Sequence, residues 1–190
     1  MNWLRKTALG IGLVLIVLIA LFFHYTLPRT AVVQISGTDI KRMGQAGTVV
    51  ERENKAGTQI ELGQHVSDVR FINSVSRKGK TMVFRNQDTG WGWPPYFKFN
   101  SADLTAEAQA YATDQDKPWV LVKYYGWRFT ITSMFPNVLN LRVVDRNYTN
   151  IPFFNIAFLT LLVVFVFFVR RKIKMLVSWV RDRNQPKNGS

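Results

Sequence analysis

The side chains best suited to recognising a ligand are concentrated in residues 85–98, with two more just after residue 126. Aromatic rings combined with arginine are typical of binding interfaces. In an extended chain Trp91 and Trp93 point to the same side, so they would form one platform for a glycan, a peptide or a protein. The candidate ligand or partner residues are Arg85, Asp88, Trp91, Trp93, Tyr96, Lys98, Trp127 and Arg128.

The same aromatic segment also suits the interior of a small domain. Most aromatic side chains in folded proteins are largely buried, and a small domain needs bulky apolar residues to fill its core. We therefore expect the rings of residues 91–99 to form the core of the central domain or a plug in it. The exposed platform is the alternative.

Groups that could carry out a reaction are scarce. His24 and His65 are far apart, and neither has a second histidine or a carboxylate at metal-ligand spacing. The sequence has no glycine-rich phosphate loop and no G-x-S-x-G motif. The absence of cysteine excludes a disulfide, a cysteine-based zinc site and a thiol nucleophile. We expect no catalytic residue, no metal and no cofactor, and hence no enzyme.

The net charge of +13 suggests nucleic-acid binding until the charge is mapped along the chain. The positive excess is concentrated beside two apolar blocks, which is the pattern of a membrane protein. Residues 24–150 between the blocks are only mildly basic. We therefore expect a lipid bilayer rather than a nucleic acid as the partner of these charges.

Both apolar blocks are long enough to cross a membrane. Residues 7–23 carry no charge and would extend roughly 25 Å as a helix, and residues 151–169 satisfy the same criterion. A cleaved signal peptide is the alternative for the first block, but the residues that follow it are too bulky for a cleavage site. We expect two transmembrane helices, one at each of these blocks.

The flanking charges predict the orientation of both spans. Residues 1–6 and residues 170–190 are basic, and basic flanks stay on the cytoplasmic side. Both termini are therefore expected in the cytoplasm, with residues 24–150 in the periplasm beyond an inner membrane.

After the second block, Ile173, Leu176, Val177 and Val180 share one helical face, which indicates a basic amphipathic helix. Such a helix lies on the cytoplasmic leaflet and is attracted by anionic lipid. The alternative is that the transmembrane helix simply continues into the cytosol. The basic residues expected at the membrane surface are Arg170, Arg171, Lys172, Lys174, Arg181 and Arg183.

Alternation with period two dominates residues 24–150 and predicts strands. One helix, residues 101–112, interrupts them, with Leu104, Ala108 and Tyr111 on one face and a cap at Asn100 or Ser101. The order predicts a mainly β (α+β) domain, a small closed or half-closed antiparallel barrel similar to the OB architecture. The expected strands are residues 31–36, 48–52, 58–62, 68–75, 81–85, 119–125, 127–133 and 138–144.

Several strings carry a family resemblance. DTGWGWPPYFKF, preceded by DVRFIN and followed by YYGWR, MFPN and IPFFN, resembles a family of short bacterial inner-membrane proteins known as a domain of unknown function. The resemblance covers residues 25–158. It implies a bacterial envelope protein with this arrangement, and it brings no reaction and no catalytic residue with it.

Two functions from different classes remain open. The first is a membrane-anchored interaction or scaffold module that binds another envelope protein or a second copy of itself. The second is a binder or sensor of a small envelope ligand, a cell-wall fragment or a lipid, through Arg85, Trp91, Trp93 and Tyr96. An envelope hydrolase is a weaker alternative, because it needs a Ser–Lys or paired-carboxylate site that the sequence does not display.

Overall fold

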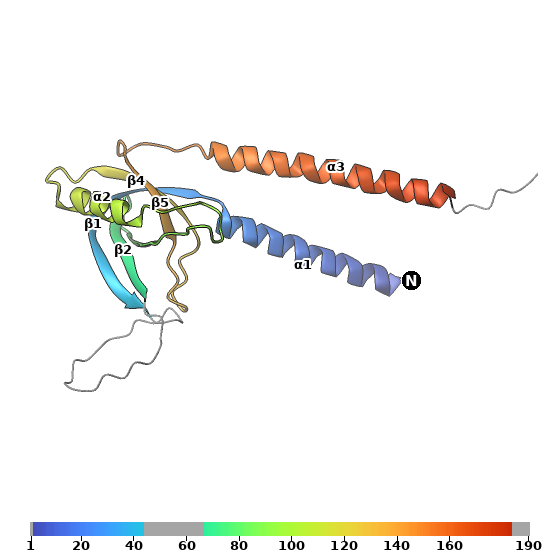
Figure 1. Cartoon of the computed structure of the whole chain (residues 1–190), viewed down its shortest axis with the longest axis horizontal. Coiled ribbons are helices and arrows are strands. Elements are labelled where there is room, and N and C mark those ends of the chain that lie inside the picture. Colours follow the sequence, from blue (N-terminus) through green and yellow to red (C-terminus); the bar gives the residue numbers. More distant parts are fainter. Residues whose placement is uncertain (1, 44–66, 184–190) are drawn as a thin grey trace, which may run out of the picture. The chain divides into compact units, whose positions relative to one another are not determined.

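The computed structural model describes residues 2–43 and 67–183, so the predicted strands 48–52 and 58–62 lie outside the described residues. The chain divides into two compact units, Met1–Asn150 and Ile151–Ser190, which are treated separately. Figure 1 shows the order of the elements. They are α1 Asn2–Thr26, β1 Arg29–Met43, β2 Ser67–Ser76, β3 Thr81–Asn86, α2 Ser101–Thr113, β4 Trp119–Tyr125, β5 Asn137–Val143 and α3 Phe153–Arg183.

Five strands form a closed barrel in the order β1-β2-β3-β5-β4. The long β1 closes it, because residues 29–34 pair with β4 and residues 33–43 pair with β2, both antiparallel. β3 and β5 meet through one parallel pair, Arg85 with Asn137. The predicted mainly β barrel is confirmed, but it is not wholly antiparallel as expected, because β3 and β5 pair in parallel. Within the barrel, three strands are followed by α2 and then by two strands. This is the predicted order, which is also that of the OB architecture.

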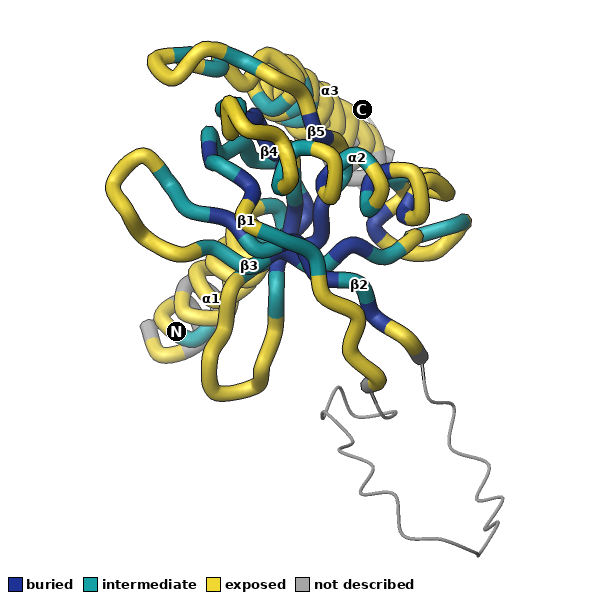
Figure 2. The backbone as a smooth tube through the Cα atoms, turned by 90° about the vertical axis from the view of Figure 1, so that its left-hand side faces the viewer, coloured by how far each residue is buried: buried dark blue, intermediate teal, exposed yellow. Residues whose placement is uncertain are grey.

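The barrel is filled by aliphatic side chains from its strands and sealed by α2. Leu104 and Ala108 of α2 are buried, and Tyr111 packs against the same core, as the helical face predicts. Figure 1 shows α2 on the side of the strands away from α1, and Figure 2 shows the buried residues gathered where the strands cross. The largest completely buried apolar side chains are Phe84, Ile72, Val33, Val120, Val122 and Val138.

Two strands differ from the prediction. β1 continues well beyond residue 36, and its register with β2 shifts between Ile35 and Gly37, so a bulge carries the strand past the glycine. The strand predicted at residues 127–133 is wrong, because that segment holds turns and one isolated bridge, Phe129 with Met134.

The two long helices differ in apolar length. Within the described residues, one helix is long and apolar enough to cross a membrane by length and composition, the segment Phe153–Leu176 of α3. The apolar part of α1, Gly10–Thr26, is shorter, so the pair of spans remains a prediction. α3 runs unbroken to Arg183, which fits the continuous helix rather than a separate amphipathic one.

Candidate functional site

A pocket of about 300 Å³ lies where the end of α1 meets the barrel. Its walls come from the last turn of α1, the residues after β3, the aromatic segment, the end of β4 and the start of β5. Three of the predicted site residues line it: Arg85, Asp88 and Trp93. The complete lining is Tyr25, Arg85, Gln87, Asp88, Thr89, Trp93, Tyr125, Gly126, Phe135 and Asn137.

Residues 126 and 127 attach the end of α1 to this side of the barrel. The backbone N–H of Gly126 donates to the carbonyl oxygen of Tyr25 at 3.0 Å. The indole Nε1–H of Trp127 donates to Nδ1 of His24 at 2.8 Å, and its ring meets Tyr25 edge-on at 5.4 Å. Gly126 adopts a φ of +91°, a conformation that other residues rarely reach, so the chain can turn here against the helix.

Arg85 supplies the positive charge of the pocket. Its backbone N–H donates to Pro136 at 2.8 Å, and its guanidinium donates to the side-chain oxygen of Gln87. Its Nε is buried and has no hydrogen-bond partner among the described residues. The ion pair found in the described ranges joins Arg42 and Asp68, so no described carboxylate neutralises Arg85. Burial lowers the pKa of Arg85, but a guanidinium remains charged at neutral pH.

Tyr125 offers a neutral donor beside that charge. Burial raises the pKa of Tyr125, the largest effect on it, so the phenol keeps its proton. Its oxygen accepts a hydrogen bond from Nδ2 of Asn137 at 3.2 Å, which leaves the hydroxyl proton available for donation. The pocket thus combines one uncompensated cation with a hydroxyl donor.

Asn137 holds the pocket wall where β3 and β5 meet. Its Oδ1 accepts from the backbone N–H of Gln87, and its Nδ2 donates to the carbonyl oxygen of Gln87, both at 2.9 Å. One side chain therefore replaces a pair of backbone ladder bonds at the end of β3. The sequence holds no signal for this contact, because an asparagine fifty residues away has no pattern that links it to Gln87.

Asp88 has a structural task as well as its place in the lining. Its two carboxylate oxygens accept from the backbone N–H and the hydroxyl of Ser101, at 2.9 and 2.8 Å. The expectation that Asn100 or Ser101 caps this helix is therefore wrong. Asn100 occupies the N-cap position but makes no side-chain cap bond, and Asp88 serves the start of α2 from outside the helix.

Lys98, predicted on the ligand or partner surface, points into the protein and is 5% exposed. Its ammonium donates to Oδ1 of Asn86 and to the carbonyl oxygen of Gln87. Burial lowers the pKa of Lys98 to about 8, and the nearby carboxylate of Asp88 partly opposes this shift. Lys98 therefore holds residues 86 and 87 and does not belong to the surface.

The aromatic rings that we expected in the core are on the surface, so the core interpretation was wrong. Trp91 is 84% exposed, Trp93 66%, Phe97 54% and Phe99 61%; we call these four rings the aromatic surface. These rings are excluded from the core because residues of the strands and of α2 already fill the barrel. Tyr96 differs from them, since its ring packs on Tyr125 at 5.0 Å and its hydroxyl donates to the carbonyl of Thr26.

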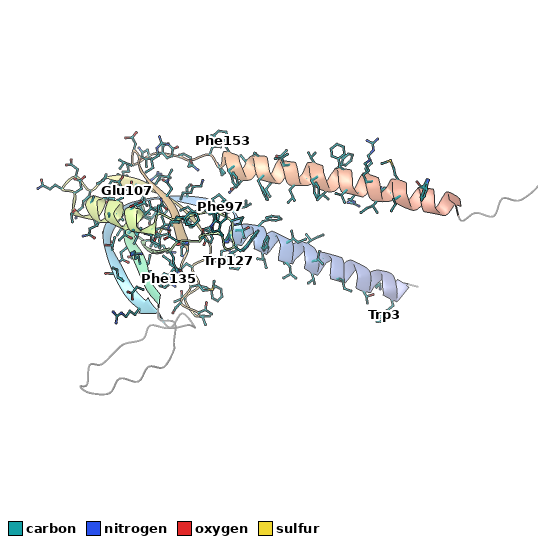
Figure 3. All side chains as sticks on the ribbon, in the orientation of Figure 1. Trp3, Phe97, Glu107, Trp127, Phe135 and Phe153 are labelled. Carbon is teal, nitrogen blue, oxygen red and sulfur yellow. The ribbon has the colours of Figure 1, made fainter. Side chains whose placement is uncertain are left out.

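The remaining predicted residues border the pocket or lie elsewhere. Trp127 is half-buried against α1, and Figure 3 shows it at that end of the barrel. The guanidinium of Arg128 stacks on Phe135, 4.0 Å from the ring centre, and donates to the carbonyl of Met134. On α3, exposed basic side chains lie at Arg170, Arg171, Lys172 and Lys174, and the helix continues through Arg181 and Arg183.

The described residues hold no group of three or more histidine, aspartate or glutamate side chains placed to bind a metal ion. The groups that the pocket offers to a ligand are the side chain of Arg85, the phenol of Tyr125 and the rings of Tyr25 and Trp93. That set is suited to binding and orienting an anionic group.

Comparison with known proteins gives a family and no activity. The family described as "Protein of unknown function (DUF1523)" matches residues 4–177. An uncharacterized protein of Haemophilus influenzae is 36% identical over 126 residues, which cover 66% of this chain and 67% of that protein. No solved structure gives a significant match.

Proposed function

The chain belongs to the DUF1523 family, which supplies no activity, so we propose from the pocket and its attachment to α1 that the protein is a membrane-anchored module that binds an anionic ligand at the barrel end. The observation that carries this proposal is Arg85, which lines the pocket and has no described carboxylate partner. A phosphate or carboxylate group fits the fork of a guanidinium through paired hydrogen bonds.

The rest of the lining limits what the ligand looks like. The pocket volume, about 300 Å³, is at the lower end for small-molecule sites, so the bound part is a headgroup or a small fragment. Tyr25 and Trp93 offer ring surfaces on which a sugar or glycerol portion can pack, and Tyr125 offers a hydroxyl. The Asp88 carboxylate is already engaged with Ser101, so it does not compete for Arg85.

The attachment of the pocket to α1 supports a ligand found at a membrane. Tyr25 lies in the last turn of the helix and also in the pocket wall. With α1 anchored in the bilayer, the pocket lies at the level of lipid headgroups. A phospholipid headgroup and a soluble phosphate share the chemistry that Arg85 recognises, so the experiment must separate them.

The test uses the full chain in nanodiscs of zwitterionic lipid. Tryptophan fluorescence, to which Trp93 in the pocket wall contributes, is measured while inorganic phosphate or short-chain phosphatidylglycerol is added. We expect saturable binding that weakens at least about tenfold in Arg85→Gln, since a charge-assisted pair is lost. Arg142→Gln is the matched control, because Arg142 is exposed on β5 and lies outside the lining, and it should bind like the original chain.

The two probes distinguish the sources of the anion. Binding of phosphatidylglycerol alone indicates a lipid headgroup, and equal binding of phosphate indicates a soluble anion. Neither probe binding, or equal affinity in Arg85→Gln and the unchanged protein, overturns the proposal.

A further inference from the structure

We propose that the aromatic surface, Trp91, Trp93, Phe97 and Phe99, inserts into the interfacial layer of the bilayer that α1 enters and seats the barrel on it. This inference rests on the membrane anchoring in the proposed function. It does not depend on a ligand in the pocket. The occupant is the lipid of the outer leaflet.

The aromatic surface is large and carries no charge. Between residues 91 and 99 the one charged side chain is Lys98, and it is buried. The ring of Trp91 meets two of the others, with ring centroids 5.3 Å from Phe97 and 6.1 Å from Phe99. Clustered exposed rings of this kind mark an interaction site, because water does not favour such a surface.

The backbone beneath the rings is fixed by hydrogen bonds, so the segment that carries the rings is ordered before it binds. The N–H of Gly92 donates to Thr89 at 2.9 Å, and that of Gly90 donates to the carbonyl of Lys98 at 3.1 Å. The buried Lys98 ammonium ties the segment to the end of β3. A preorganised surface loses little conformational entropy when it binds.

The backbone conformation of Phe97 also supports an interaction site at the aromatic surface. Its φ is +49°, a left-handed conformation that is costly for a bulky residue. The ring nevertheless lies outside the core and is more than half exposed. Strained residues concentrate at functional sites, where the surrounding structure maintains them. Figure 3 places Phe97 at the end of the barrel from which α1 leaves.

The contact with α1 identifies lipid as the occupant. The ring of Trp93 stacks on Phe22 of α1, with centroids 5.5 Å apart and planes 21° from parallel. The apolar side chains of α1 are exposed along the preceding turns, from Ile11 to Phe22. The aromatic surface is therefore continuous with the helix surface that lipid would cover. Tryptophan is enriched where acyl chains meet headgroups.

The experiment measures the depth of single tryptophans in vesicles. The chain has six tryptophans, and variants of the full chain keep one and replace the others with phenylalanine. The proteins are reconstituted into phosphatidylcholine vesicles with bromine at a shallow acyl position. We expect strong quenching of Trp91 and Trp93, and weak quenching of Trp119 on β4. Trp3 on α1 reports whether the anchor has inserted.

A second measurement avoids the multiple replacements. Because the chain has no cysteine, Trp91→Cys and Phe99→Cys can each carry one nitroxide label. Ile40→Cys is the matched control, since Ile40 is 64% exposed on β1, far along the strand from α1. We expect labels at 91 and 99 to be accessible to oxygen in lipid and protected from a water-soluble nickel complex, with the reverse at 40.

The outcomes separate this inference from its premise. Trp91 quenched no more than Trp119, in vesicles where Trp3 is quenched, overturns the docking surface and leaves the anchoring intact. Contact between labels at residue 91 of two copies also overturns it, because the occupant is then a second chain. Failure of the whole chain to float with vesicles overturns the docking surface together with the anchoring. Loss of ligand binding in Arg85→Gln affects neither result.

Discussion

The phenolic hydroxyl of Tyr96 donates a hydrogen bond to the carbonyl oxygen of Thr26, the last residue of α1. The final carbonyls of a helix lack partners within it, so this bond satisfies one of them. The same ring packs on Tyr125 of β4. One side chain thus joins the aromatic segment, the helix and the barrel.

Replacing Tyr96 with phenylalanine should loosen this junction. The variant keeps the ring contact and leaves the Thr26 carbonyl without its donor, which should lower the free energy of unfolding by about 1 kcal/mol. The measurement is chemical unfolding of the full chain in detergent micelles, followed by near-UV circular dichroism. Tyr148→Phe is the control, and an equal loss in both variants would contradict the assigned role.

Removing the Asn137 side chain should weaken the closure of the barrel. Asn137→Ala leaves the N–H and the carbonyl of Gln87 unpaired beside the parallel contact of β3 with β5. We expect a loss of about 2 kcal/mol, together with faster hydrogen exchange at residues 85–87. Asn140→Ala, an exposed position on the same strand, should change neither quantity. Unchanged exchange in Asn137→Ala would refute this account of the closure.

Alkaline pH should stabilise the protein through Lys98. The folded-state pKa is about 8 and the ordinary value is 10.5, so between these values the unfolded chain holds a proton that the folded chain has released. The free energy of unfolding therefore rises from about pH 8 to pH 10, on the order of 2 kcal/mol. Below about pH 8 Lys98 stays charged in the folded protein, although its burial disfavours the charged form.

Above pH 10 the tyrosines reverse this trend. Burial raises the pKa of Tyr96 to about 12, so the unfolded chain ionises first and stability falls. Unfolding of the full chain across this range should therefore show a maximum near pH 10. The Lys98→Met variant should lack the rising limb, and parallel pH curves for the two proteins would exclude Lys98 as its source.

Asp88 should contribute more to α2 than an acidic residue within the helix. Asp88→Ala removes both acceptors from Ser101, and we expect a loss of about 1 to 2 kcal/mol, as for an N-cap residue. Asp103→Ala is the matched control, because Asp103 lies in the first turn and acts through the helix dipole alone, at about 0.5 kcal/mol. Thermal unfolding of both variants gives the comparison, and the reverse order would show that Asp88 does not cap α2.

Four strands were predictable because they are short runs of apolar, β-branched or aromatic residues bounded by turn residues, even where burial does not alternate, as at Val120, Leu121 and Val122 of β4. β2, β3, β4 and β5 begin and end within two residues of their expected bounds. The far half of β1 was missed, because Gly37, Thr38 and Asp39 resemble a turn and are carried instead by pairing with β2. Residues 127–133 alternate equally well, but periodicity does not reveal whether a strand has a neighbour.

The site was predictable in composition but not in orientation. Arg85 and Trp93 were singled out by type, and both line the pocket. Lys98 was chosen on the same grounds and is buried, because its partners, Asn86 and Gln87, approach only after folding. The exposed state of Trp91 depends on how completely aliphatic residues elsewhere fill the barrel. A burial rule that holds for most aromatic residues fails at such a surface.

Only Leu27 and Pro28 separate the last residue of α1 from the first residue of β1, and bonds from residues 96, 126 and 127 bridge the same gap. The barrel therefore cannot rotate freely relative to α1 at this connection. A change in the tilt of α1, such as a thinner or thicker bilayer imposes, would turn the whole barrel with it and raise or lower the pocket mouth relative to the lipid. With α1 in a bilayer, as we propose, this short connection would make the height of the pocket depend on membrane thickness.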